Sequence, residues 1–125
     1  MSRKKIIVIA PIRNEEWILD AFLTAASAFA DHIVLGDHQS TDSSPEIAAK
    51  YPKVHYFQSR IESFSERERR DELLHHARKF GSGHVIISLD ADELLSPDFV
   101  SADHLETIRE LPQGTRIALP FFNLK

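Results

Sequence analysis

The chain has 125 residues, of which 42% are hydrophobic and 27% are charged, and its formal net charge is −4. This length and composition indicate a soluble globular protein with one core, so residues 1–125 are expected to form a single domain. The acidic balance without a basic patch disfavours nucleic-acid binding, and the absence of cysteine excludes disulfides, thiolate metal sites and thiol catalysis.

The N-terminal segment MSRKK is basic and leads directly into the first apolar run. It lacks the pattern of a cleavable signal, and the longest apolar runs are far shorter than the roughly 20 residues of a membrane-spanning helix. These features and the lack of cysteine favour a cytoplasmic location. A short basic start usually forms a solvated chain end; the alternative is peripheral contact with anionic lipid at the inner face of the membrane.

Four apolar segments are predicted to be strands. Three of them are continuous runs rich in Ile and Val, which is typical of strands covered by helices on both faces. The segments are 5–10, 32–37, 53–58 and 84–90. They predict a parallel sheet.

Helical patterns lie between these strands. Residues 15–29 have apolar side chains at three- and four-residue spacing, with Asn14 as the predicted N-cap. A second helix begins at Ser44 with Pro45 in its first turn, and a third spans residues 65–80 and ends at GSG. The charged run RIESFSERERRDELL is interpreted mainly as a solvated helix face. This alternation predicts a three-layer α/β sandwich with a mostly parallel sheet and right-handed crossovers.

The last third of the chain is less regular. The segment SPDFVSADHLETIRELP is predicted to contain one or two short helices. The segment RIALPFFNLK is predicted to contain a fifth strand.

Polar residues follow three of the predicted strands, in the segments APIRNEE, GDHQSTD and DADE. Ligands of such sheets bind at the carboxyl ends of the strands, where these three segments converge. We therefore expect the functional site at this edge.

Asp90 and Asp92 follow the fourth strand and bring two negative charges close together. Such carboxylates repel each other unless a shifted proton or a cation relieves them. A hard divalent ion, Mg²⁺ or Mn²⁺, is the usual relief, and it would also hold substrate phosphate oxygens. The alternative is that these acids and Glu93 cap the next turn and face water.

The other two exits carry candidate ligand contacts that also have structural explanations. Asp37 ends the second strand, so its carboxylate is expected to face the crevice and to accept a hydrogen bond from a base or ribose. Arg13 suits phosphate or sugar, because its guanidinium is always charged and donates five N–H groups. Asn14 and Glu15 suit the cap and the dipole of the following helix equally well.

Together these segments resemble family 2 glycosyltransferases of the GT-A fold. The resemblance covers residues 5 to about 100 in order. IIVIAPIRNEEWIL resembles the first strand and its exit, VLGDHQSTDSS the D-x-x-S-T-D turn, FSERERRDELLHHA the arginine-bearing helix, and VIISLDADELLSPDFV the D-x-D strand. It implies a Rossmann-like, N-terminal donor-binding half of such a fold.

This resemblance implies inverting transfer of a sugar from a nucleoside-diphosphate sugar to a saccharide or lipid-linked acceptor, with Mn²⁺ or Mg²⁺ as cofactor. Asp92 would ligate the metal, Asp90 would reach the ribose or the sugar, and Arg70 would lie beside the diphosphate. The nucleoside would be held by Pro11, Glu15 and Asp37. The D-A-D-E variant resembles enzymes that build bacterial cell-surface polysaccharide cores.

The chain departs from the family pattern in several ways, which include a small insertion around KFGSG. His38 and Gln39 replace an acid and a glycine that are common after Asp37, and Asp71 replaces a common asparagine. The chain is also about half as long as a complete domain of this type. We therefore expect the acceptor-binding half and the general base to be absent, and donor binding to be retained more readily than turnover.

Two other functions stay open. A metal-dependent nucleotidyltransferase of related topology would need a glycine-rich loop after the first strand, which APIRNEE lacks. A non-catalytic nucleotide-binding or interaction module would pair with another chain, such as a second copy, through the incomplete sheet edge and the apolar ALPFFNL segment.

Overall fold

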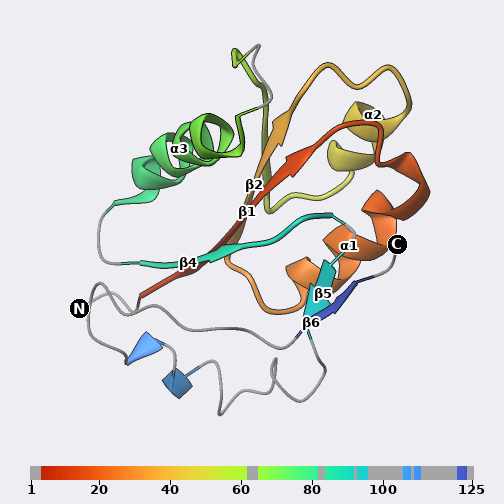
Figure 1. The fold of residues 1–125 in the computed structure, drawn as a ribbon. Coiled ribbons are helices and arrows are strands. Elements are labelled where there is room, and N and C mark those ends of the chain that lie inside the picture. Colours follow the sequence, from red (N-terminus) through yellow and green to blue (C-terminus); the bar gives the residue numbers. More distant parts are fainter. Residues whose placement is uncertain are drawn as a thin grey trace.

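The computed structural model describes residues 4–61, 65–81, 84–91, 93–95, 106–107, 109–110 and 121–123. The main strands are β1 (Ile6–Ile12), β2 (His32–Asp37), β3 (Val54–Gln58) and β4 (Val85–Ser88). The helices are α1 (Glu16–Ser27), α2 (Ser44–Ala48) and α3 (Glu66–Ala77), and the short 3₁₀ helix η1 (Arg78–Phe80) follows α3. The four strands form one parallel sheet in the order β3-β2-β1-β4 (Figure 1).

Helices cover both faces of this sheet. Helices α1 and α2 lie on one face and α3 lies on the other (Figure 1). Alternate residues of β1 pack on opposite faces of the sheet, because successive side chains of a strand point to opposite sides. Ile6 and Val8 pack in the cluster that contains α1, whereas Ile7 and Ile9 pack with Leu73 of α3. The predicted three-layer α/β sandwich is confirmed.

The strand predictions hold, with small differences at their ends. Strand β1 continues to Ile12, and β4 ends at Ser88 rather than at residue 90. The ladder still extends one residue further, since the Leu89 N–H donates to the carbonyl of Ile9 over 3.0 Å. Asp90 therefore lies just beyond the last backbone hydrogen bond of the sheet, at its carboxyl edge.

The third predicted helix is also confirmed. Ser65 caps α3, because its hydroxyl accepts a hydrogen bond from the backbone N–H of Glu68 over 3.3 Å. The helix tightens into η1 and ends at Gly81, which has a φ of 103°. Its ψ of 176° makes this an extended conformation with positive φ, which glycine adopts without a steric cost.

A second sheet, of two strands, is separate from the main one. The predicted fifth strand appears as β6 (Phe121–Asn123), which pairs antiparallel with β5 (Glu93–Leu95) and not with the main sheet. Of the predicted helices in this region, only a short helical stretch around Arg109 lies within the described residues. No described helix has the length and apolar character needed to cross a membrane.

Arg109 ties this region to the start of β1. Its side chain is 9% exposed, its Nε donates to the carbonyl of Lys4 over 3.2 Å, and its guanidinium lies 3.7 Å from the carboxylate of Asp31. The same carboxylate accepts a hydrogen bond from the backbone N–H of Ile6 over 2.8 Å. A residue far along the chain thus fixes the amino end of the central strand.

Gly36 sets how closely α3 approaches the sheet. A Cβ atom at this position would lie 2.9 Å from Cζ of Phe57 and 3.1 Å from Cδ2 of Leu73. The Phe57 ring cannot easily yield, because it stacks on His76 of α3 with ring centroids 3.7 Å apart. The backbone of β2 is therefore in direct contact with the side chains that hold α3.

We predict that Gly36→Ala lowers the free energy of unfolding by about 1–3 kcal/mol, the usual cost of overpacking a core. Phe57→Leu should restore part of this loss in the double variant, because it removes the ring atom nearest to the new methyl group. Urea unfolding of the two single variants and the double variant measures this coupling. Additive effects of the two substitutions would contradict the proposed contact.

Candidate functional site

Two loops at the carboxyl edge of the sheet hold each other in place. One follows β1 and contains Asn14; the other follows β2 and contains Ser40 and Thr41. The Asn14 N–H donates to the hydroxyl of Ser40 over 2.8 Å, and the Thr41 N–H donates to the Asn14 side-chain oxygen over 2.7 Å. Asn14 has a φ of 52°, a left-handed conformation that asparagine tolerates better than most residues.

The same two loops exchange helix caps. The backbone N–H of Glu16, in the first turn of α1, donates to the carboxylate of Asp42 over 3.1 Å. In return, the carboxylate of Glu16 accepts from the N–H of Ser43, just before α2, over 3.0 Å. The hydroxyl of Ser44 accepts from the N–H of Glu15 over 3.1 Å. Each loop therefore satisfies backbone donors that the other helix leaves open.

This arrangement corrects the prediction that Asn14 is the N-cap of α1. The N-cap is Glu15, whose side chain makes no cap hydrogen bond, and Ser44 and Asp42 supply the cap from the neighbouring loop. Local spacing suggested a cap within the same segment. Because the partners are more than 25 residues away in sequence, no local pattern could identify them.

Burial raises the pKa of the Asp42 carboxyl, but the hydrogen bonds donated by Ser44 and Glu16 outweigh burial and lower this pKa below its ordinary value. The carboxylate is thus stabilised in its charged form. The resulting stability is present at neutral pH and is lost only as the pH falls through this lowered pKa.

A cavity of about 270 Å³ opens beside these loops, between the strand ends and α3. Residues at the ends of all four strands of the parallel sheet and on α3 line it, as expected from the convergence of the strand exits. Five of the seven predicted site residues are among them: Pro11, Arg13, Glu15, Arg70 and Asp90. The cavity therefore joins most of the residues that the sequence singled out.

The cavity also contains residues that the sequence interpretation missed. Glu66, Arg69 and Glu72 line it together with Arg70, so the charged run of α3 is not only a solvated face. Their spacing of three and four residues places them on one side of the helix, which was the available signal. Glu72 fixes the exit of β3, since its carboxylate accepts from the Ser59 hydroxyl over 2.6 Å and from the Arg60 N–H over 2.9 Å.

His38 is another residue that the sequence interpretation did not place in the site. It lines the cavity, its side chain is 6% exposed, and its backbone N–H donates to the carbonyl of Ile12 over 2.9 Å. Burial lowers the pKa of His38, and the nearby guanidinium groups of Arg69 and Arg13 lower it further. The imidazole is therefore neutral at pH 7 and offers both a donor and an acceptor.

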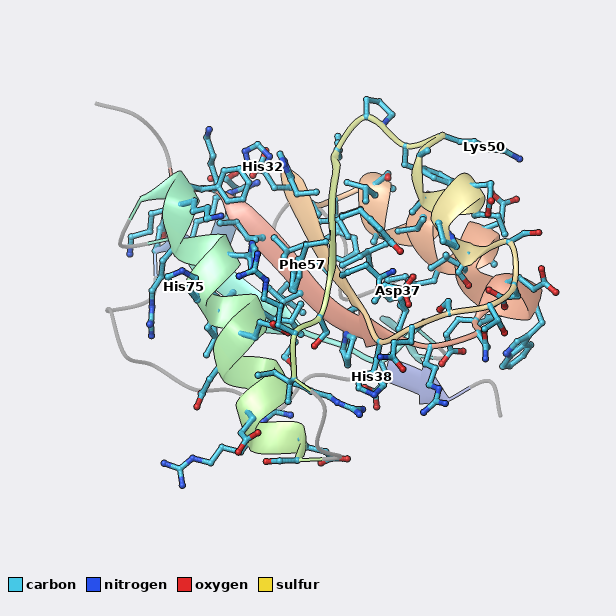
Figure 2. The ribbon with its side chains drawn as sticks, turned by 90° about the horizontal axis from the view of Figure 1, so that it is seen from above. His32, Asp37, His38, Lys50, Phe57 and His75 are labelled. Carbon is cyan, nitrogen blue, oxygen red and sulfur yellow. The ribbon has the colours of Figure 1, made fainter. Side chains whose placement is uncertain are left out.

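Asp37, in contrast, does not line the cavity. Its side chain is fully buried, and its carboxylate accepts hydrogen bonds from the Ser40 N–H over 3.0 Å and from the hydroxyl of Tyr56 (Figure 2). Burial, together with the hydrogen bond to Asp37, raises the pKa of Tyr56 to about 12, so the phenol keeps the proton that it donates. This differs from the expectation that the Asp37 carboxylate faces the crevice. Successive residues at the end of β2 point to opposite faces, and His38 takes the cavity side.

The predicted metal ligand Asp92 lies outside the described residues. Among the residues that the structure describes, no three histidine or carboxylate side chains are close enough to hold a metal ion. Asp90 and Glu15 nevertheless bring carboxylate oxygens to the same cavity, and oxygen donors suit Mg²⁺ or Mn²⁺. Such ions keep several waters and bind substrate phosphates, so one or two protein carboxylates fit their chemistry.

The family model of glycosyl transferase family 2 matches residues 7–114, which include the parallel sheet except for Ile6, the interlocked loops and every residue that lines the cavity. No curated protein sequence matches the chain.

We predict that Asp42→Ala lowers the free energy of unfolding by about 1–2 kcal/mol, because it removes acceptors from the first turns of both α1 and α2. Asp71→Ala, which removes an exposed carboxylate from α3, serves as the matched control and should change stability by less than about 0.5 kcal/mol. Thermal and urea unfolding at pH 7 measure both effects. Equal stabilities of the two variants would contradict the cap exchange.

Proposed function

The chain belongs to glycosyl transferase family 2, and on this premise we propose that its cavity binds a nucleoside-diphosphate sugar for inverting transfer of the sugar. The observation that carries this proposal is the convergence of Arg13, Arg69, Arg70 and Asp90 in one cavity at the carboxyl edge of a parallel sheet. Nucleotides bind at this edge in open α/β sheets.

The charges of the cavity suit a diphosphate. Three guanidinium groups come from two different elements, so they can contact phosphate oxygens from two sides. Such charge-assisted contacts are roughly twice as strong as neutral hydrogen bonds. In the proposed mechanism, Arg70 and Arg13 hold the diphosphate, and Asp90 orients the ribose or the sugar. These contacts stabilise the negative charge that develops on the leaving nucleoside diphosphate.

We propose that Mn²⁺ or Mg²⁺, held by Asp92, is the cofactor. A divalent ion there would neutralise charge on the leaving group as a Lewis acid. Asp90 and Glu15, which line the cavity, would add two further carboxylates near this ion. The general base that takes the acceptor proton is not assigned to a residue of this chain.

The nucleoside contacts are proposed from the geometry at the end of β2. Pro11 and Glu15 line the cavity, as expected for residues that hold the nucleoside. His38 would meet the base directly, because its neutral imidazole presents one donor and one acceptor, as the edges of nucleobases do. Asp37 would act indirectly, by fixing the turn that carries His38 through its hydrogen bond to Ser40.

For the acceptor, we propose a saccharide or lipid-linked saccharide in bacterial cell-surface polysaccharide synthesis, on the basis of the D-A-D-E motif at residues 90–93. This activity would lie in the cytoplasm or at the inner face of the membrane. Within the described residues, β4 pairs only with β1, so its other edge is where a second copy would join the sheet. The family match favours glycosyl transfer over nucleotidyl transfer.

We predict that uridine, guanosine or cytidine diphosphate binds the chain, and that Mn²⁺ strengthens the binding. Arg70→Ala should weaken it at least about 10-fold, because a hydrogen bond to a charged group contributes about 1.5–3 kcal/mol. Arg78→Ala in η1 removes the same charge away from the cavity and is the control. Isothermal titration calorimetry measures the affinities. The donor-site proposal fails if none of the three nucleotides binds.

The metal assignment has a separate test. Asp92→Ala should remove the effect of Mn²⁺ on nucleotide affinity and leave the metal-free affinity unchanged. An unaltered response to Mn²⁺ in this variant would reject Asp92 as the ligand.

We further predict that His38→Ala lowers nucleotide affinity about 10-fold and reduces the difference in affinity among the three nucleotides. Tyr56→Phe, which removes a hydrogen bond from Asp37 on the opposite face, should lower stability by about 1–3 kcal/mol and leave the nucleotide preference unchanged. Calorimetric titration of both variants separates the two roles. A loss of preference in Tyr56→Phe alone would assign the base contact to Asp37.

A further inference from the structure

A second cavity lies on the outer side of β3, against α3. Its volume is about 620 Å³, and residues of the β3 exit and of α3 line it. A smaller cavity of about 240 Å³ shares Phe57, His76 and Lys79 with it and extends to Phe80. Ser59 and Glu72 line both this cavity and the donor cavity, whereas Phe57, Arg60, His75, His76 and Lys79 do not line the donor cavity.

The floor of this cavity is aromatic. Phe57 and His76 both line it, and their rings stack with an interplanar angle of 11°. Burial lowers the pKa of His76, and the charges of Lys79 and His75 lower it further. The ring is therefore neutral at pH 7 and can lie flat against the apolar face of Phe57.

The rim of the cavity is basic. Lys79 and Arg60 stand on it, from η1 and from the β3 exit, and His75 adds a third nitrogen-bearing side chain. The Lys79 ammonium lies 3.5 Å from Nδ1 of His76, so its charge is close to the stacked rings. Figure 2 shows Phe57 between the sheet and α3, and His75 on α3.

The acid in this cavity is already engaged. Glu72 is the carboxylate among the lining residues, and both of its oxygens accept hydrogen bonds, from the Ser59 hydroxyl and the Arg60 N–H. Glu72 thus holds the loop after β3, and its oxygens do not pair with the side chains of Lys79 and Arg60 in these two hydrogen bonds. The cavity therefore combines an apolar floor with an excess of positive charge, which suits a ligand with an apolar ring and an anionic group.

We propose that this cavity is a second binding site, separate from the donor cavity, for a small anionic ligand with an aromatic or similarly flat apolar part. The anionic group lies between Lys79 and Arg60, and the apolar part packs on Phe57 and His76. The side chains of Lys79 and Arg60 do not line the donor cavity, so the two sites are separable by substitution.

Phenyl phosphate is the probe, and it is titrated by calorimetry into the full chain saturated with uridine diphosphate and Mn²⁺. We expect one binding event, weakened at least 10-fold by Lys79→Ala and by Arg60→Ala. Lys50→Ala removes an exposed charge at the end of α2, on the other side of the sheet, and should leave the affinity unchanged (Figure 2). Inorganic phosphate should bind at least 10-fold more weakly than phenyl phosphate.

Several outcomes overturn the proposal. They are the absence of binding, equal affinities of wild type and the Lys79→Ala and Arg60→Ala variants, and equal affinities of phenyl phosphate and inorganic phosphate. If phenyl phosphate binds the free chain but not the chain saturated with uridine diphosphate, the probe lies in the donor cavity and the second site is rejected. If uridine diphosphate itself does not bind, the effects of Lys79→Ala and Arg60→Ala still decide this proposal. Circular dichroism melting confirms that the variants are folded, as expected for substitutions at exposed positions.

Discussion

The site depends on the exchange of hydrogen bonds between the loops after β1 and β2. Parallel strands end at the same edge, so the two loops lie close enough for each to accept hydrogen bonds from backbone donors at the start of the helix in the other. Asp42 and Ser44 accept hydrogen bonds from backbone N–H groups at the start of α1, and Glu16 accepts one from the N–H just before α2. Moving either loop alone would break these hydrogen bonds. These contacts also hold the residues that line the adjacent cavity in place. A preorganised site of this kind loses less conformational entropy when it binds a flexible ligand.

The end of β2 divides the work between two neighbouring residues. Asp37 turns into the protein and secures the loop through Ser40 and Tyr56, while His38 turns toward α3 and the cavity. A charged carboxylate is well suited to the first task, since it accepts several hydrogen bonds at once. A neutral imidazole suits the second. The residue that a motif highlights and the residue that a ligand meets are therefore adjacent but distinct in this chain.

The sequence predicted the repetitive part of this fold well and its long-range contacts poorly. The four strands and α3 followed from apolar runs, helical spacing and the GSG stop, because these signals are local. The cap of α1 was assigned to Asn14, since the true partners lie in another loop. The orientation of Asp37 depended on strand register, which shifts a side chain to the other face with each residue. The pairing of β6 with β5 likewise depends on residues far apart in the chain.

Glu72 lines both cavities, as does Ser59, with which its carboxylate is hydrogen-bonded. One oxygen holds the Ser59 hydroxyl and the other holds the Arg60 backbone. A displacement of the Glu72 side chain would thus change the lining of both cavities. Communication between remote sites usually requires a chain of packed elements. Here the two cavities share lining residues. Binding in one cavity can therefore be linked to affinity in the other without a change in the overall conformation.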